Sequence, residues 1–167
     1  MPTISVRRFC YDTLKANLKP DDRIVIVSCD SCARQSDGLG GEDGLNSLAD
    51  KLVADGFNVV HRQLLPVACS AHQLTDRLQE APIRKLFEEA DIVIPLSCQA
   101  GEERASQTLA NIRILGVTRA LDTGSVSPER GTRLTKALDG VEIEIDSPEG
   151  ISTTDAAKQL GLYSGSF

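Results

Sequence analysis

Runs of β-branched apolar residues constrain the fold of this chain more than any other feature of its sequence. Residues 23–28 and 91–97 each hold a continuous apolar run without alternating polar side chains, which is typical of strands buried on both faces. Residues 57–65 and 114–117 are predicted as two more strands. Between the first two strands in chain order, apolar side chains recur over residues 45–53 with the spacing of an amphipathic helix. Strand and helix alternate in this way along the chain, so the sequence predicts an α/β class: a Rossmann-like, mostly parallel sheet of about five strands flanked by helices.

The remaining expected elements follow from capping and turn residues. Ser127 followed by Pro128 has the form of a helix N-cap with proline in the first turn, which predicts a helix ending at Gly140. The strict alternation over residues 141–145 predicts an edge strand, the fifth of the sheet. Further helices are expected at residues 9–18 and from residue 70 to Phe87, the latter interrupted at Pro82. Ala105, Leu109 and Ile112 mark another helix after Cys98. The last expected helix covers residues 152–160, with Ser152 as its N-cap and Gly161 at its C-terminus.

Length and charge narrow the possible functions. At 167 residues the chain is predicted to form one α/β domain over residues 1–167, with a helical extension at 1–20 and the main domain at 21–162. Its net charge of −6 and its lack of Trp argue against binding to nucleic acid, which favours a basic face and aromatic side chains. The apolar runs are too short to span a bilayer, and no apolar stretch follows the first basic residues. We therefore expect a cytoplasmic protein that binds neither nucleic acid nor membranes.

Four of the five cysteines are expected at one edge of the predicted sheet. Cys29 ends the first predicted strand and Cys32 follows it at C-x-x-C spacing, while Cys69 and Cys98 follow the next two strands. The carboxyl ends of parallel strands meet at a single edge, where ligands bind in open α/β sheets. Four thiols on three loops could therefore converge on one small volume. Cys10 lies in the N-terminal segment and needs no role beyond packing.

A thiolate-bound metal suits this edge, and three interpretations of the cysteines stay open. A [4Fe–4S] cluster would be held by Cys29, Cys32, Cys69 and Cys98, with helix N-termini and small neighbouring residues supplying amide donors. The same four thiolates could form a closed structural zinc site. Alternatively, Cys29 and Cys32 form a redox-active dithiol, or the cysteines are simply buried. The glycine-rich segment 38–44 is a poor match to a phosphate-binding loop because it is acidic and lies far from the strand end; a loop covering the cysteines is the favoured interpretation.

Several motifs, in order along nearly the whole chain, resemble a known family. The sequence resembles the small, cysteine-containing subunit of the two-subunit methylenetetrahydrofolate reductases, a family that also includes the C-terminal domain of such reductases. The likeness covers residues 20–162. Its motifs are the VIVSCDSC segment at 25–32, Gly40-Gly41, the segment 55–60, Cys69 before a helix, residues 90–94 leading into SCQAG at 97–101, ALDT at 120–123 and PEGI at 148–151 followed by DAAK at 155–158.

The resemblance implies a function for the cysteines and a partner for the chain. It implies that Cys29, Cys32, Cys69 and Cys98 ligate an iron–sulfur cluster, and that the subunit docks on a flavin-containing barrel subunit to which it passes electrons. A ferredoxin-like protein would be the electron donor. The chain itself would contain no catalytic residue and would act as an accessory, assembly subunit of the reductase. One departure matters: longer family members carry a further cysteine-rich segment, whereas this chain has no cysteine after Cys98.

Overall fold

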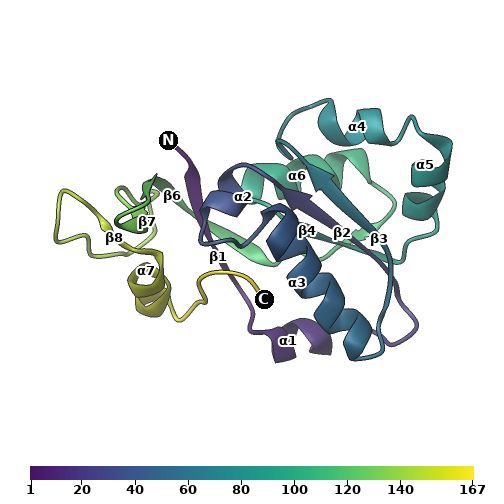
Figure 1. The fold of residues 1–167 in the computed structure, drawn as a ribbon, viewed down its shortest axis with the longest axis horizontal. Helices are drawn as coiled ribbons and strands as arrows, with labels where there is room; N and C mark the ends of the chain where they lie inside the picture. The colour runs from purple at the N-terminus through teal and green to yellow at the C-terminus, as the bar shows by residue number, and fades with distance from the viewer.

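The computed structural model describes residues 1–167 and contains two four-stranded sheets (Figure 1). One sheet is parallel, with strand order β3-β2-β4-β5, and the other is antiparallel, with order β1-β6-β7-β8. We call them the parallel half and the antiparallel half. The strands are β1 (Thr3–Arg7), β2 (Arg23–Cys29), β3 (Asn58–Leu65), β4 (Ile92–Leu96), β5 (Arg113–Ile114), β6 (Thr118–Ser127), β7 (Gly131–Leu134) and β8 (Ile151–Ser152).

Helices cover both faces of the parallel sheet. Alternate residues of β2 point to opposite faces, so Ile24 and Ile26 pack on one side and Val25 and Val27 on the other. The first side holds a core of 14 buried residues with α1 and α3, and the second holds 11 with α4, α5 and α6. This burial on two faces explains why the strand sequences are continuously apolar. The helices are α1 (Tyr11–Ala16), α2 (Cys32–Gln35), α3 (Gly41–Ala54), α4 (Gln73–Arg77), α5 (Ala81–Glu88), α6 (Gln99–Thr108) and α7 (Thr153–Leu160).

The antiparallel half lies beside the parallel half and has a smaller core. Its seven buried apolar residues come from β1, β6, β7, β8 and α7, including Ile4, Leu121 and Leu134. Helix α7 begins at the N-cap Ser152, whose hydroxyl accepts a hydrogen bond from the backbone N–H of Asp155, and ends at Gly161 in the left-handed conformation. Both ends of α7 agree with the prediction. None of the seven helices has the length and apolar character needed to cross a bilayer.

The α/β class of the prediction is correct, but the number of strands in the parallel sheet and the length of its last strand are not. The α/β class and the strands at 23–28, 57–65 and 91–97 are confirmed within a residue or two at each end. The parallel sheet has four strands, and the last is only Arg113–Ile114, where residues 114–117 were expected to form a full strand. The chain leaves this sheet after Ile114 and enters the antiparallel sheet at Thr118.

Residues 127–145 are the largest disagreement between prediction and structure. No helix covers residues 127–140: β6 runs through Ser127, and a tight turn returns the chain as β7. The Ser127 hydroxyl accepts a hydrogen bond from the N–H of Arg130 at 3.1 Å, so it closes this hairpin turn instead of capping a helix. Gly131 has a φ of +67°, which continues the turn into β7.

The predicted edge strand at 141–145 is not a strand either. Val141, Ile143 and Ile145 pack against the core of the antiparallel half, as their alternation requires. The backbone of Glu144, between these residues, is hydrogen-bonded to a side chain and not to a strand. Its N–H donates to Gln159 Oε1 at 2.8 Å, and Gln159 Nε2 donates to its carbonyl oxygen. The alternation of apolar and polar residues over 141–145 therefore predicts correctly which side chains are buried. The hydrogen bonds that a neighbouring strand would form are made instead by Gln159 of α7.

The N-terminal segment agrees with the prediction only in part. Helix α1 lies within the expected 9–18, but the preceding residues form strand β1, which pairs with β6. The helix after Cys98 ends at Thr108, before Leu109 and Ile112. Segment 1–20 is thus a strand followed by a helix and not a helical extension.

Candidate functional site

The four predicted cysteines lie where three neighbouring parallel strands end. Cys29 is the last residue of β2, Cys32 the first of α2, and Cys98 the N-cap of α6 directly after β4. Cys69 lies in the loop between β3 and α4. These strands are adjacent and parallel, so all four residues belong to the carboxyl edge of one sheet. We call this region the cysteine edge.

Close backbone contacts join the three loops of the cysteine edge. The N–H of Ala68, next to Cys69, donates to Cys29 Sγ at 3.4 Å. A Cβ placed on Gly101 in the first turn of α6 would lie 3.2 Å from the Cβ of Ala68 and 2.7 Å from Ser97 Oγ. A Cβ on Gly40 would lie 2.9 Å from the carbonyl oxygen of Cys29. Glycine is therefore required at both positions, because any side chain would push the loops apart.

The electrostatics of Cys98 link it to two other cysteines. Burial raises the pKa of the Cys98 thiol, and negative charge on the nearby Cys32 and Cys69, when they are thiolates, raises it further. Hydrogen bonds from the backbone N–H groups of Gly101 and Ala100 oppose this rise because they stabilise the thiolate. Cys98 thus lies within electrostatic range of cysteines from the two neighbouring loops, with the N-terminus of α6 directed at its sulfur.

Burial differs among the four thiols. Cys29 and Cys98 are buried, Cys32 is half-buried and Cys69 is exposed. Cys29 packs with the apolar residues of the core beneath α4, α5 and α6. The cysteine edge therefore extends from the core to solvent, so a group bound there would be accessible from one side.

A buried hydroxyl without a partner lies next to Cys98. Ser97 is 1% exposed, and its Oγ forms no hydrogen bond. It lies against Gly101 of α6, near Ala68, whose N–H binds Cys29 Sγ. A buried hydroxyl normally has a hydrogen-bond partner, so this one marks a place where a sulfur or another acceptor would be stabilised. The sequence places a serine before Cys98 but gives no sign that its hydroxyl is left unpaired.

The thiols are free in this structure. All five cysteines are reduced, and no group of three or more His, Cys, Asp or Glu side chains is arranged to hold a metal ion. The donor set nevertheless fits a thiolate-bound group in its chemistry: four cysteines on three loops in contact, amide donors at α6 and one unsatisfied hydroxyl. Ligation by all four sulfurs would need their side chains to reorient.

Cys10 lies outside this arrangement, whereas the glycine-rich segment touches it through Gly40, which packs against the backbone of Cys29. Cys10 is the N-cap of α1, with its sulfur 3.2 Å from the Thr13 hydroxyl. Hydrogen bonds from the side chain and backbone of Thr13 lower the pKa of Cys10. Segment 38–44 leads from α2 into α3, and Glu42 and Asp43 occupy the first turn of α3. Negative charge in that turn disfavours a phosphate there, as the sequence indicates.

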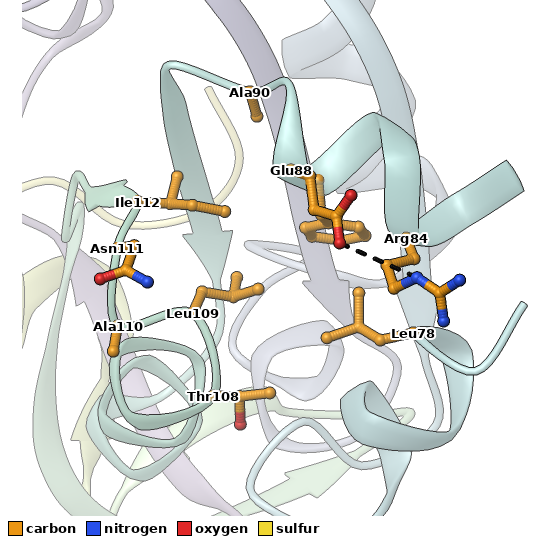
Figure 2. Close-up of a pocket in the computed structure, with 10 residues that line it drawn as sticks. Leu78, Arg84, Glu88, Ala90, Thr108, Leu109, Ala110, Asn111 and Ile112 are labelled. Carbon is orange, nitrogen blue, oxygen red and sulfur yellow. Dashed lines mark ion pairs between the residues drawn. The ribbon is translucent and has the colours of Figure 1, made fainter. Parts of the chain in front are cut away.

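A cavity of about 440 Å³ lies away from the cysteines, near the amino ends of β4 and β5 (Figure 2). Leu78, Leu109 and Ile112 face one another across it, and Arg84 and Glu88 form an ion pair of 3.8 Å at its side. It contains no cysteine and no unpaired charged side chain that would select a ligand, so it does not compete with the cysteine edge as a functional site.

Comparison of the chain with family models, with curated proteins and with solved structures finds no match in any of the three. The resemblance to the small reductase subunit therefore rests on the motifs of the sequence, and the role of the cysteines rests on those motifs and the geometry of the cysteine edge.

Proposed function

We propose that this chain is an iron–sulfur electron-transfer and assembly subunit of a methylenetetrahydrofolate reductase complex. The observation that carries the proposal is the position of Cys29, Cys32, Cys69 and Cys98 on three contacting loops at one sheet edge. The motifs shared with the small reductase subunits are the second support. In this proposal the chain has no catalytic residue, and the flavin-containing partner subunit reduces the folate.

The four cysteines have distinct roles in this proposal. Buried Cys29 and Cys98 would hold the inner side of a [4Fe–4S] cluster, and Cys32 and Cys69 the side nearer to solvent. The amides of Ala100 and Gly101, in the first turn of α6, would donate to the Cys98 thiolate. The cluster would supply one-electron transfer, and the exposure of Cys69 gives the partner subunit a close approach to it.

Metal content of protein purified without oxygen tests the proposal most directly. We expect about four irons and four sulfides per chain and a brown colour that dithionite bleaches, the signature of a [4Fe–4S] cluster. Cys98→Ser and Cys69→Ala should both lose iron. Cys10→Ser is the matched control and should keep it, because Cys10 lies on α1, away from the cysteine edge. Full iron content in both Cys98→Ser and Cys69→Ala would contradict the ligand assignment.

A structural zinc module is the second candidate function. It is favoured by the burial of two of the four cysteines, since closed four-thiolate sites exclude solvent. In this case the purified protein is colourless and holds one zinc, and the chain holds the reductase together without carrying electrons. A C-x-x-C redox protein would instead bind no metal and form a Cys29–Cys32 disulfide on oxidation. The same metal analysis, followed by thiol titration, separates all three.

Complex formation tests the partner. Co-expression with a flavin-containing barrel subunit should give a single species on gel filtration that carries both flavin and iron. A subunit that loads with iron but never co-elutes with the flavoprotein would retain the electron-transfer role and refute the reductase assignment.

A further inference from the structure

A second hollow borders the cysteine edge and is lined by two arginines that form no ion pair. The cavity of about 610 Å³ is the largest in the molecule. It lies where the end of β1, the start of β6, the first residue of α6 and the loop 138–141 come together, with Arg8, Arg119 and Gln99 in its wall. A volume of this size suits a small-molecule ligand, because typical ligand pockets measure about 300–1,000 Å³.

The two arginines are free to bind an anion. Neither Arg8 nor Arg119 forms an ion pair, although eight other basic side chains do. Asp139 is the one acidic residue in the wall. Outside the wall, Glu102 of α6 is close enough for the charge of Arg8 to affect it, without forming an ion pair. The cavity therefore carries net positive charge in a chain whose overall charge is −6.

Arg8 is also held in place. Its Nε donates to the carbonyl oxygen of Thr118 at 2.5 Å, and its backbone N–H donates to the Val117 carbonyl at 2.8 Å. This leaves its terminal guanidinium N–H groups free for a ligand. A planar guanidinium fixed at one nitrogen loses less conformational freedom on binding, and its remaining donors match the oxygens of a phosphate.

The rest of the wall supports a ligand larger than a simple ion. Leu138, Val141 and Leu162 line the cavity, and Leu138 is 39% exposed. Exposed apolar side chains beside two arginines provide a surface for the uncharged part of a ligand. Gln99 begins the ten-residue helix α6, so the positive end of that helix adds to the attraction for an anion.

We propose that this cavity binds a nucleoside phosphate, with Arg8 and Arg119 on the phosphate groups and Leu138, Val141 and Leu162 against the nucleoside. The site is joined to the cysteine edge through one residue: the Thr118 hydroxyl donates to the carbonyl oxygen of Ser97 at 2.5 Å, while the Thr118 carbonyl accepts from Arg8. A bound ligand would therefore lie beside Cys98. The proposal does not require a metal at the cysteines, so its test is independent of the proposed function.

Calorimetric titration of the full chain with ADP, adenosine, pyrophosphate and succinate tests the site. ADP should bind tightest, pyrophosphate more weakly because it lacks the nucleoside, and adenosine and succinate weakest, and added salt should weaken the binding of ADP and pyrophosphate. Arg119→Ala should weaken ADP binding about tenfold, because it removes a charge-assisted contact. This variant removes no hydrogen bond or ion pair of the fold, so its thermal stability should match the wild type.

Three other variants test which side chains contact the phosphate groups and which contact the nucleoside. Arg8→Ala should weaken ADP and pyrophosphate about tenfold, and its folding is checked by circular dichroism because it loses the bond to Thr118. Leu138→Ala should weaken ADP about threefold and leave pyrophosphate unchanged, as expected for loss of an exposed apolar contact. Arg130→Ala is the control: Arg130 is exposed and paired with Glu149 outside the cavity.

The outcomes separate the proposal from its alternatives. Succinate binding as tightly as pyrophosphate would overturn the preference for phosphate, and pyrophosphate binding as tightly as ADP would overturn the nucleoside contact. Absence of heat with every phosphate, or ADP affinity unchanged in the Arg8→Ala/Arg119→Ala double variant, would overturn the site. None of these results depends on whether iron is found at the cysteines.

Discussion

The two halves of the molecule bury apolar side chains to very different extents. The parallel half has cores of 14 and 11 buried residues on the two faces of its sheet, whereas the antiparallel half has a single core of seven. Strands β7 and β8 in the antiparallel half have only four and two residues. Stability grows with the apolar area removed from water. The parallel half should therefore be the stable unit of the molecule, and the antiparallel half the part that opens first.

Truncation of Phe87 should have the largest effect, because it removes the largest side chain that is fully buried in the parallel half. Phe87 is 1% exposed and packs from α5 against the sheet. Phe87→Ala should lower the free energy of unfolding by about 3–5 kcal/mol, measured by urea denaturation. Val53→Ala, at a side chain that is 51% exposed, is the control and should change it little. A cost below about 1 kcal/mol for Phe87→Ala would show that this core is loosely packed.

The equivalent change in the antiparallel half should act locally. Leu134 of β7 is completely buried in the smaller core. Leu134→Ala should cost about 2–4 kcal/mol, and hydrogen exchange should quicken in β6, β7 and α7 while β2 and β4 keep their protection. Leu138→Ala, at a partly exposed side chain of the same half, is the control. Equal loss of protection in β2 would contradict two units of unequal stability.

Two cysteines at helix N-caps of the parallel half differ chemically. The pKa of Cys98, the N-cap of α6, is raised by burial, and the pKa of Cys10, the N-cap of α1, is lowered by hydrogen bonds from Thr13. Because the thiolate is the reactive form, metal-free protein at pH 7 should be alkylated by iodoacetamide at Cys10 about tenfold faster than at Cys98. The difference should narrow as the pH is raised towards 9. Mass spectrometry of the labelled peptides measures both rates, and faster labelling of Cys98 at pH 7 would mean that burial does not protect its thiol.

The smallest effect is expected at the N-cap of α7. The Ser152 hydroxyl accepts from the N–H of Asp155 at 3.0 Å and donates to its carboxylate at 2.7 Å. Ser152→Ala should cost about 1 kcal/mol, seen as a slightly lower Tm. Ser125→Ala is the matched control, since Ser125 is an exposed residue of β6 in the same half. Identical melting of the two variants would mean that α7 is held by packing alone.

The same difference between the halves decided what the sequence could predict. Strands β2, β3 and β4 were identified because burial on two faces makes a strand apolar along its whole length. Strand β1 was missed because it is short and pairs with β6, so its signal lies in a partner more than a hundred residues away. Ser127 misled because a serine hydroxyl can cap a helix or close a turn, and only the pairing of β6 with β7 selects the turn.

The candidate sites differ in the same way. The sequence could predict which sheet edge holds the four cysteines, because each lies at or after the end of a strand in a parallel sheet: Cys29, Cys32, Cys69 and Cys98. The cavity between Arg8, Arg119 and Gln99 could not, because these residues come from three separate segments, which the pairing of β1 with β6 and the hydrogen bond from Thr118 to Ser97 bring together.

The pairing of β1 with β6 also has a consequence for synthesis on the ribosome. The complete parallel sheet, from Arg23 to Ile114, is made between the two strands. At ribosomal speeds β1 therefore waits on the order of ten seconds for its partner. During that wait the apolar side chains of Ile4 and Val6 are uncovered on a strand with a free edge. Arg7 and Arg8, which follow directly, place positive charge beside this segment and discourage nascent chains from pairing with one another.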